Sequence, residues 1–121
     1  MKRAWLMVAV LCLIGWSGRA ADDVQAAWKK AVGFLAKAQG EDGAWGYSRG
    51  KVGITAVNLE ALALAPENIH AEAKDMMRKA AEYLVAQQKE DGAIHDEYAP
   101  KNYSTSHAVQ ALIQYDHKQY A

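Results

Sequence analysis

The sequence Lys-Ala-Val-Gly-Phe-Leu-Ala-Lys-Ala-Gln-Gly-Glu-Asp-Gly-Ala-Trp, residues 30–45, returns in altered form as Lys-Ala-Ala-Glu-Tyr-Leu-Val-Ala-Gln-Gln-Lys-Glu-Asp-Gly-Ala-Ile, residues 79–94. The two copies align without a gap at an offset of 49 residues (79 − 30). A second pair of similar blocks, 55–62 and 105–112, lies at an offset of 50 residues (105 − 55), so one residue is inserted in the second intervening loop. A constant period of this length is typical of repeat proteins. We therefore predict two copies of one helical hairpin.

The residues of the first copy suggest how the turn is held. Phe34 and Leu35 are the last large apolar residues before Gly43, which accepts the positive φ of a tight turn. Gln39 can offer its amide to unpaired carbonyls at the helix end or in the next loop. Trp45 would cover this amide and the turn with its ring, and its indole N–H needs an acceptor. These residues are best interpreted as turn and core.

This spacing resembles the QW motif of the squalene–hopene cyclase and protein prenyltransferase superfamily, in which a basic residue, an aromatic-Leu pair, Gln, Gly and Trp follow one another at fixed intervals. The positions that match in the first copy are Lys30, Ala31, Phe34, Leu35, Gln39, Gly43 and Trp45. The second copy matches at Lys79, Ala80, Tyr83, Leu84, Gln88 and Gly92, but has Ile94 where the motif has Trp. In that family the motif braces the structure and is separate from the catalytic residues.

The resemblance implies an all-α fold in which hairpins of an outer and an inner helix are arranged around a ring. Family members have about six hairpins in the ring, whereas this sequence has two, about 23–66 and about 67–121. We therefore predict an incomplete α/α toroid with an uncovered apolar inner face. Either the helices collapse into a four-helix bundle, or the face is covered by self-association or by another protein chain.

The N-terminal residues have the pattern of a secretory signal peptide. A basic head at residues 1–3 precedes an apolar run from Ala4 to Trp16 and a small-residue tail, with cleavage expected after Ala20. The run is shorter than the roughly 20 residues of an ordinary membrane span, although an uncleaved anchor is an alternative. Cys12 lacks the small residue expected before a lipoprotein cysteine, so we predict no lipid anchor. The protein is expected to be exported, periplasmic or secreted.

A mature chain that begins at Ala21 would contain no cysteine, which excludes disulfides, thiolate catalysis and cysteine-ligated zinc from it. Without Lys2, Arg3 and Arg19, 11 basic residues remain against 14 acidic ones, a net charge of about −3. This balance does not favour nucleic acid or an anionic membrane surface as a partner. We predict no cofactor and no metal.

Apolar periodicity predicts the helices. The first mature helix runs from about Asp23 to Ala38, with Asp22 or Asp23 as its N-cap. Residues 54–64 are apolar on nearly all sides, which is typical of a buried helix, and Pro66 ends it. The next helix is expected from Ala71 to Gln87, after a polar segment that begins at Glu67. Ser104 or Ser106 could cap a last helix that ends in a polar tail.

The catalytic residues of related folds are missing. No Asp-x-Asp-Asp acid motif of the squalene cyclases is present, and the mature chain lacks the cysteine of prenyltransferase zinc sites and of the complement thioester. We therefore predict a binding or assembly module that is not an enzyme. The alternative is a fragment or subunit of a toroid enzyme, either terpenoid-cyclase-like or polysaccharide-degrading.

Two sets of loop residues are weaker candidates for a site. A metal or acid–base cluster would use His95, Asp96, Glu97 and His107, although solvated loop charges are commoner than such a cluster. Aromatic and charged residues of both loops could bind a sugar or a protein if the loops lie at one end of the stack: Asp42, Tyr47, Arg49, Asp91, Tyr98 and Lys101.

Overall fold

The computed structural model describes residues 2–47 and 49–120, and the side chains of residues 20–47 and 49–117. The chain divides into two compact units, Met1–Gly33 and Phe34–Ala121. The helix α1, Lys2–Ala38, forms the described part of the first unit, and its last residues belong to the second. Within the described residues, no helix is both long enough and apolar enough to span a bilayer.

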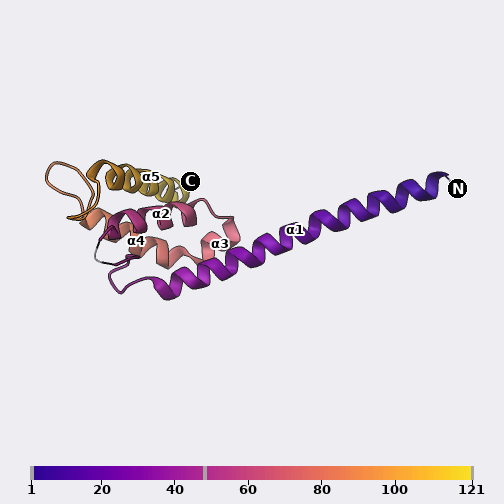
Figure 1. Ribbon diagram of the computed structural model, residues 1–121, viewed down its shortest axis with the longest axis horizontal. Helices are drawn as coiled ribbons and strands as arrows, with labels where there is room; N and C mark the ends of the chain where they lie inside the picture. The colour runs from indigo at the N-terminus through magenta and orange to yellow at the C-terminus, as the bar shows by residue number, and fades with distance from the viewer. Residues whose placement is uncertain (1, 48, 121) are drawn as a thin grey trace. The chain divides into compact units, whose positions relative to one another are not determined.

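The second unit contains the remaining helices (Figure 1). These are α2 (Lys51–Ala63), α3 (Glu67–Glu72), α4 (Lys74–Ala86) and α5 (Lys101–Tyr120). The described part of the chain holds no strand beyond an isolated antiparallel bridge between Gln88 and Ile94. The all-α prediction of two hairpin repeats, an incomplete toroid, is therefore confirmed.

The core of this unit is centred on α2, which packs against α5 most extensively and also against α3 and α4. Its fully buried side chains include Val52, Ala56, Leu59 and Leu62. The opposing helices contribute Ile69, Met77, Ala80, Leu84, Ala108 and Ala111. In α4 the buried residues recur at three- and four-residue intervals, as predicted, while Arg78, Lys79 and Glu82 are exposed.

Both prolines precede helices, which corrects two of the predicted helix starts. Pro66 has φ −54°, and its carbonyl accepts the N–H groups of Ile69 and His70. The predicted helix from Ala71 therefore begins at Glu67, and it breaks at Ala73 into α3 and α4. Pro100 likewise accepts the N–H of Ser104, so α5 begins at Lys101. A preset φ makes proline suitable for the helix start.

The predicted serine caps are wrong for the same reason. Ser104 is buried inside α5, and the Ser106 hydroxyl donates to the carbonyls of Asn102 and Tyr103 within the helix. The predicted polar tail is helical to Tyr120, and Ala121 lies outside the described residues. The helix α2 begins at Lys51, before the residues 54–64 that the sequence predicts as helix.

At the other end, Asp22 and Asp23 lie inside α1 and do not cap it. No proline occurs before Pro66, so every residue of this segment can donate its backbone N–H to a continuing helix. The predicted end at Ala38 is confirmed. The leader and the domain boundaries at residues 20 and 66 stay predictions.

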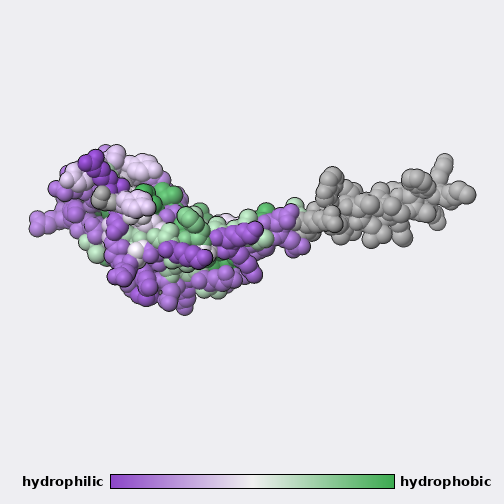
Figure 2. Space-filling view, turned by 60° about the horizontal axis from the view of Figure 1, so that its bottom comes forward, coloured by the Kyte–Doolittle hydropathy of each residue, from purple (hydrophilic) through white to green (hydrophobic). Residues whose placement is uncertain are grey.

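The expectation that α2 is buried on all sides is wrong. Ile54, Val57 and Leu64 are 45%, 42% and 56% exposed. Phe34 of the repeated motif is also exposed, at 70%. On the face of the chain that Figure 2 shows, hydrophilic side chains predominate, and apolar ones reach the surface in patches between them. Part of the apolar pattern in this sequence is therefore not used in the chain's own core.

Candidate functional site

The first repeat turn, residues 39–45, is a compact loop that glycine makes possible. The Gly40 N–H donates to the Ala44 carbonyl at 2.8 Å, and the Gly43 N–H donates to the Gly40 carbonyl at 2.9 Å. Gly43 has φ 84°, a left-handed conformation that side-chain-bearing residues rarely adopt. A Cβ on Gly43 would also lie 2.4 Å from the Lys79 carbonyl oxygen of α4. This turn therefore requires glycine for its conformation and for its contact with the next repeat.

Gln39 and Trp45 hold this turn from two sides. The Gln39 amide donates to the Gly43 carbonyl at 2.8 Å and to the Met76 carbonyl of α4 at 2.9 Å. The Trp45 indole N–H donates to the Leu35 carbonyl at the end of α1, at 2.8 Å. Trp45 is 2% exposed. The carbonyl of Met76 is the acceptor that the sequence did not indicate, because it belongs to the next hairpin.

Thr55 of α2 connects the turn to the inner helix. It is fully buried, and its Oγ1 accepts the Trp45 backbone N–H at 2.9 Å. The same hydroxyl lies 3.4 Å from the Trp45 carbonyl, to which it donates. Buried backbone groups need hydrogen-bond partners. The Thr55 hydroxyl serves as the partner of the Trp45 N–H and carbonyl, which lie outside any helix or strand. The matching of Thr55 with Thr105 between the repeats was the sequence signal for this role.

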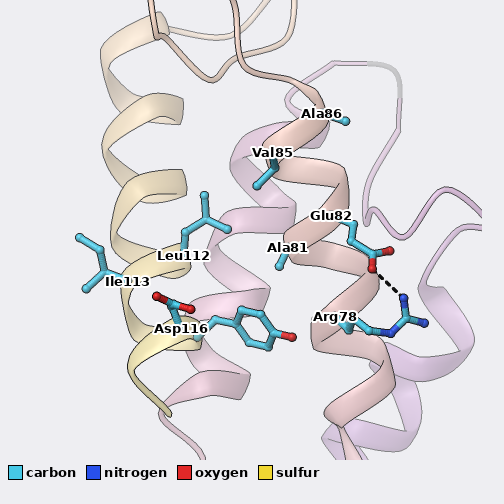
Figure 3. Close-up of a pocket in the computed structure, with 9 residues that line it drawn as sticks. Arg78, Ala81, Glu82, Val85, Ala86, Leu112, Ile113 and Asp116 are labelled. Carbon is cyan, nitrogen blue, oxygen red and sulfur yellow. Dashed lines mark hydrogen bonds and ion pairs between the residues drawn. The ribbon is translucent and has the colours of Figure 1, made fainter. Parts of the chain in front are cut away.

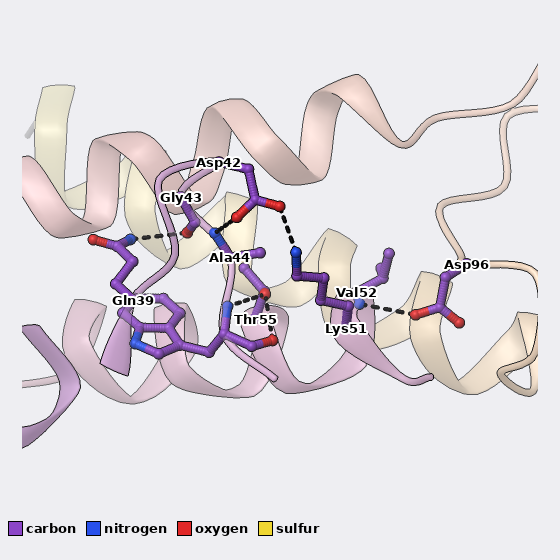
Figure 4. Close-up of polar contacts among 9 residues, drawn as sticks. Gln39, Asp42, Gly43, Ala44, Lys51, Val52, Thr55 and Asp96 are labelled. Atoms are coloured by element: carbon purple, nitrogen blue, oxygen red, sulfur yellow. Dashed lines mark hydrogen bonds and ion pairs between the residues drawn. The ribbon is translucent and has the colours of Figure 1, made fainter. Parts of the chain in front are cut away.

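Two carboxylates hold the start of α2 (Figure 4). Asp42 accepts the Ala44 N–H at 3.2 Å and the Lys51 ammonium at 2.5 Å. The hydrogen bond from Lys51 lowers the pKa of Asp42, and the reciprocal bond raises the pKa of Lys51. Asp96, from the second loop, accepts the Val52 N–H at 3.0 Å. Because the first N–H groups of a helix lack internal partners, Asp96 acts on α2 as a capping carboxylate supplied from another loop.

The second turn, residues 88–94, repeats this arrangement. Gly92 has φ 87°, and its N–H donates to the Lys89 carbonyl at 2.9 Å. The Gln88 amide donates to the Gly92 carbonyl at 3.2 Å. Thr105 Oγ1 accepts the Ile94 N–H at 3.1 Å, as Thr55 does for Trp45. The glutamine and glycine of each copy, together with the matched threonines Thr55 and Thr105, therefore form the same kind of turn twice.

The residues predicted as a metal or acid–base cluster are divided between two places. His95 is 8% exposed, and its Nδ1 donates to the Asp96 carbonyl at 2.8 Å. Glu97 is exposed. His107 packs edge-on against Tyr103, and its Nδ1 lies 3.8 Å from a Glu60 carboxylate oxygen. Among the described residues, no group of three His, Cys, Asp or Glu side chains is arranged to hold a metal.

The residues predicted to bind a ligand come partly together. The Arg49 guanidinium lies 5.1 Å from the centre of the Tyr98 ring, so the two loops do meet. Asp42 and Asp91 are engaged by the backbone of their own turns. Tyr47 is 91% exposed, and Lys101 is the exposed first residue of α5. These last two side chains point to no shared site.

An apolar groove of about 790 Å³ lies between α4 and α5. The side chains of Val85 and Leu112 point into it from the two helices (Figure 3). Arg78 and Glu82 form an ion pair at 2.7 Å on one rim. Val85 is 59% exposed, although it belongs to the groove. No motif or spacing in the sequence marks this groove.

Comparison with known proteins agrees with the fold. The sequence profile of the squalene–hopene cyclase C-terminal domain matches residues 4–113. The chain therefore belongs to the squalene–hopene cyclase family. A lanosterol synthase of Aspergillus fumigatus is 30% identical over 96 residues, which are 78% of this chain and 13% of that protein. No solved structure matches the chain significantly.

Proposed function

We propose that the chain is an exported cyclase-like repeat module that works by binding or assembly and does not itself catalyse cyclisation. The observation that supports this most is the use of its polar side chains. At both turns the glutamine, aspartate and threonine side chains are bonded to backbone groups. They hold the hairpins together, which leaves them unsuited to act on a substrate.

The Asp42 carboxylate also has the wrong proton affinity for an acid catalyst. A general acid must keep its proton until it meets the substrate, which requires a raised pKa. The Lys51 ammonium instead lowers the pKa of Asp42. Asp96 is already engaged as well, because it accepts the Val52 N–H at 3.0 Å.

Activity assays test the non-catalytic part of the proposal. The purified chain is incubated with squalene and with 2,3-oxidosqualene, and products are identified by gas chromatography with mass detection. We expect no cyclic product beyond that of the heat-denatured chain. A product that Asp42→Asn or Asp96→Asn abolishes would overturn the proposal.

Mass spectrometry of the protein from its own cells tests export. Cleavage as proposed gives a chain that begins at Ala21, and the matched variant Ala20→Arg, which replaces the small residue before the cleavage point, should retain the leader. A wild-type protein that keeps residues 2–20 would contradict the processing.

A second candidate function is a subunit or fragment of a terpenoid-cyclase-like enzyme. It is favoured by the similarity to lanosterol synthase, of which the chain spans only 13%. A reading frame that continues past residue 121 into further repeats and an Asp-x-Asp-Asp motif would support this candidate.

A further inference from the structure

The groove between α4 and α5 corresponds to a surface that is covered in the first repeat. At the offset of 50 residues, Leu112 and Ile113 of α5 match Leu62 and Ala63 of α2 (112 − 62). Leu62 and Ala63 are 1% and 0% exposed, and α2 packs against α3, α4 and α5. Ile113 is 61% exposed, and Leu112 is half-buried. The second repeat thus presents a face for which the described residues provide no third layer.

The second turn also lacks a neighbouring helix among the described residues. The Gln39 amide reaches a carbonyl of the next repeat, that of Met76, whereas the Gln88 amide is exposed and bonded at 3.2 Å to its own turn. A Cβ on Gly43 would collide with Lys79, whereas a Cβ on Gly92 would meet no atom within 4 Å. The second turn has the geometry of the first without the helix that the first one contacts.

A helix of matching pattern exists elsewhere in this chain. Apart from Ala81, which lines the groove, the residues that α4 and the residue before it bury are Ala73, Met76, Met77, Ala80 and Leu84. At the offset of 49 residues, their counterparts in α1 are Val24, Ala27, Trp28, Ala31 and Leu35. Val24 is 55% exposed, Ala27 and Ala31 are exposed too, and Trp28 and Leu35 are half-buried. We call residues 24, 27, 28, 31 and 35 the α1 stripe.

We propose that the α1 stripe of a second copy of this chain docks in the α4–α5 groove, and this inference rests on the proposed assembly role. The helix would occupy the place that α4 takes against α2 in the first repeat. The carbonyl of Ala27, which matches Met76, would then accept the free donor of Gln88. The carbonyl of Lys30, which matches Lys79, would lie beside Gly92.

The two contacting surfaces differ, so the interface is heterologous, and copies associate head to tail. Such an interface leaves one groove and one stripe free at the ends of any open assembly. Association should therefore increase with concentration beyond the dimer, unless the ring closes. This behaviour separates the proposed interface from an isologous dimer, which stops at two copies.

Three exposed valines supply matched variants for the test. Val24→Asp alters the stripe and Val85→Asp alters the groove, whereas Val57→Asp on α2, 42% exposed, is the control outside both. Association of the processed protein is measured by sedimentation velocity across the micromolar range. We expect the first two variants to raise the dissociation constant about tenfold or more, because the interface would bury an unpaired carboxylate. The control should change it less than about twofold.

Mixing the variants decides the geometry. Val24→Asp retains a groove and Val85→Asp retains a stripe, so the mixture should form a discrete dimer with the affinity of the wild-type contact. Neither variant should do so alone. Failure to form this dimer, equal effects of all three substitutions, or a wild-type protein that stays monomeric would overturn the proposal.

A photo-crosslinking residue at position 85, introduced in the native host, distinguishes this inference from the proposed function. A crosslink to residues 24–35 of another copy supports the inference. A crosslink to a different protein would show that a second copy does not occupy the groove, but it would agree with an assembly role. A crosslink to a lipid would also overturn the second copy as the occupant. No crosslink together with a monomeric protein would overturn both.

Discussion

The two repeat turns of this protein have the same backbone and different surroundings. Gly43 and Gly92 have φ values of 84° and 87°. In each turn a glutamine amide donates to a backbone carbonyl, and an aspartate and a threonine each accept a backbone N–H. The first turn lies against α4, which accepts a second hydrogen bond from Gln39 and leaves no room for a Cβ on Gly43. The second turn has no such neighbour within the described residues.

This difference distinguishes the effect of the motif on the conformation of its own turn from its effect on the contact with the next repeat. Local hydrogen bonds shape both turns, so the glycine, glutamine and threonine suffice for the loop conformation. The contribution to tertiary stability depends on the helix of the following repeat. Substitutions at matched positions should therefore have unequal effects on the free energy of unfolding, and the second turn serves as the internal control.

The largest difference is expected at Trp45 and Ile94. Trp45→Ala should lower the free energy of unfolding by about 3–5 kcal/mol, because it leaves a large cavity and removes the donor to the Leu35 carbonyl. Ile94→Ala should lower it by about 2 kcal/mol, the lower end for an aliphatic residue, because a turn without a neighbour can relax around the cavity. Urea denaturation followed by circular dichroism measures both. If Trp45→Ala does not fold, Trp45→Phe keeps most of the apolar area and tests the lost donor separately.

An equal or larger loss at Ile94 would contradict the view that the first turn is held more tightly.

The two glycines come next. Gly43→Ala should lower the free energy of unfolding by about 3 kcal/mol, because left-handed strain of about 1–2 kcal/mol adds to a backbone collision with Lys79. Gly92→Ala carries the strain alone, so we expect a loss of about 1 kcal/mol. The same urea titration at a concentration where the protein is monomeric measures the difference. Equal losses would show that α4 shifts to accommodate the added Cβ at position 43, so that the collision with Lys79 costs little.

The glutamines should show a smaller difference. Gln39→Leu removes the partner of two carbonyls, those of Gly43 and Met76, and should cost about 1–3 kcal/mol. Gln88→Leu removes one exposed bond of 3.2 Å and should cost about 0.5 kcal/mol or less. Thermal unfolding of the two variants beside the parent compares them. If Gln88→Leu is as unstable as Gln39→Leu, the loss of stability comes from the hydrogen bond inside the turn and not from the contact of Gln39 with the Met76 carbonyl.

The repeat and its turns could be predicted from the sequence because they depend on local chemistry. Gly43 must accept a positive φ, and Trp45 must bury a large ring near its own turn, so both are visible in a short stretch. The partner of Gln39 could not be predicted in the same way. Met76 lies 37 residues away, and no pattern marks which carbonyl of the next helix the amide will reach.

The misplaced helix starts have a comparable explanation. The sequence pattern predicts Pro66 as the end of a helix, but its carbonyl also accepts the N–H groups of Ile69 and His70 in α3. Proline at a boundary indicates a break without telling which side is helical. The capping role of Asp96 at Val52 was not predicted, because residues 44 positions apart meet only after the hairpins pack. Its neighbour His95 was assigned to a site on residue type alone.

The smallest expected difference concerns charge. Asp42 pairs with Lys51, and the side chains of the two are 46% and 30% exposed. Among the described residues, no ion pair joins their counterparts Asp91 and Lys101. Asp42→Asn keeps an oxygen for the Ala44 N–H, so it removes the charge alone, and an exposed pair contributes about 0–1 kcal/mol. Asp91→Asn is the matched control and should change stability less.

The stability difference between the parent and Asp42→Asn should depend on pH in a defined direction. Lys51 lowers the pKa of Asp42 in the folded chain, so the contribution is complete above the pKa of the unfolded carboxyl. As the pH falls through the lowered pKa, the carboxylate gains its proton and the contribution is lost, so parent and Asp42→Asn should converge in acid. High salt should shrink the difference at neutral pH, because both groups are partly solvated. A gap that widens in acid, or that Asp91→Asn reproduces, would show that the ion pair does not distinguish the two turns.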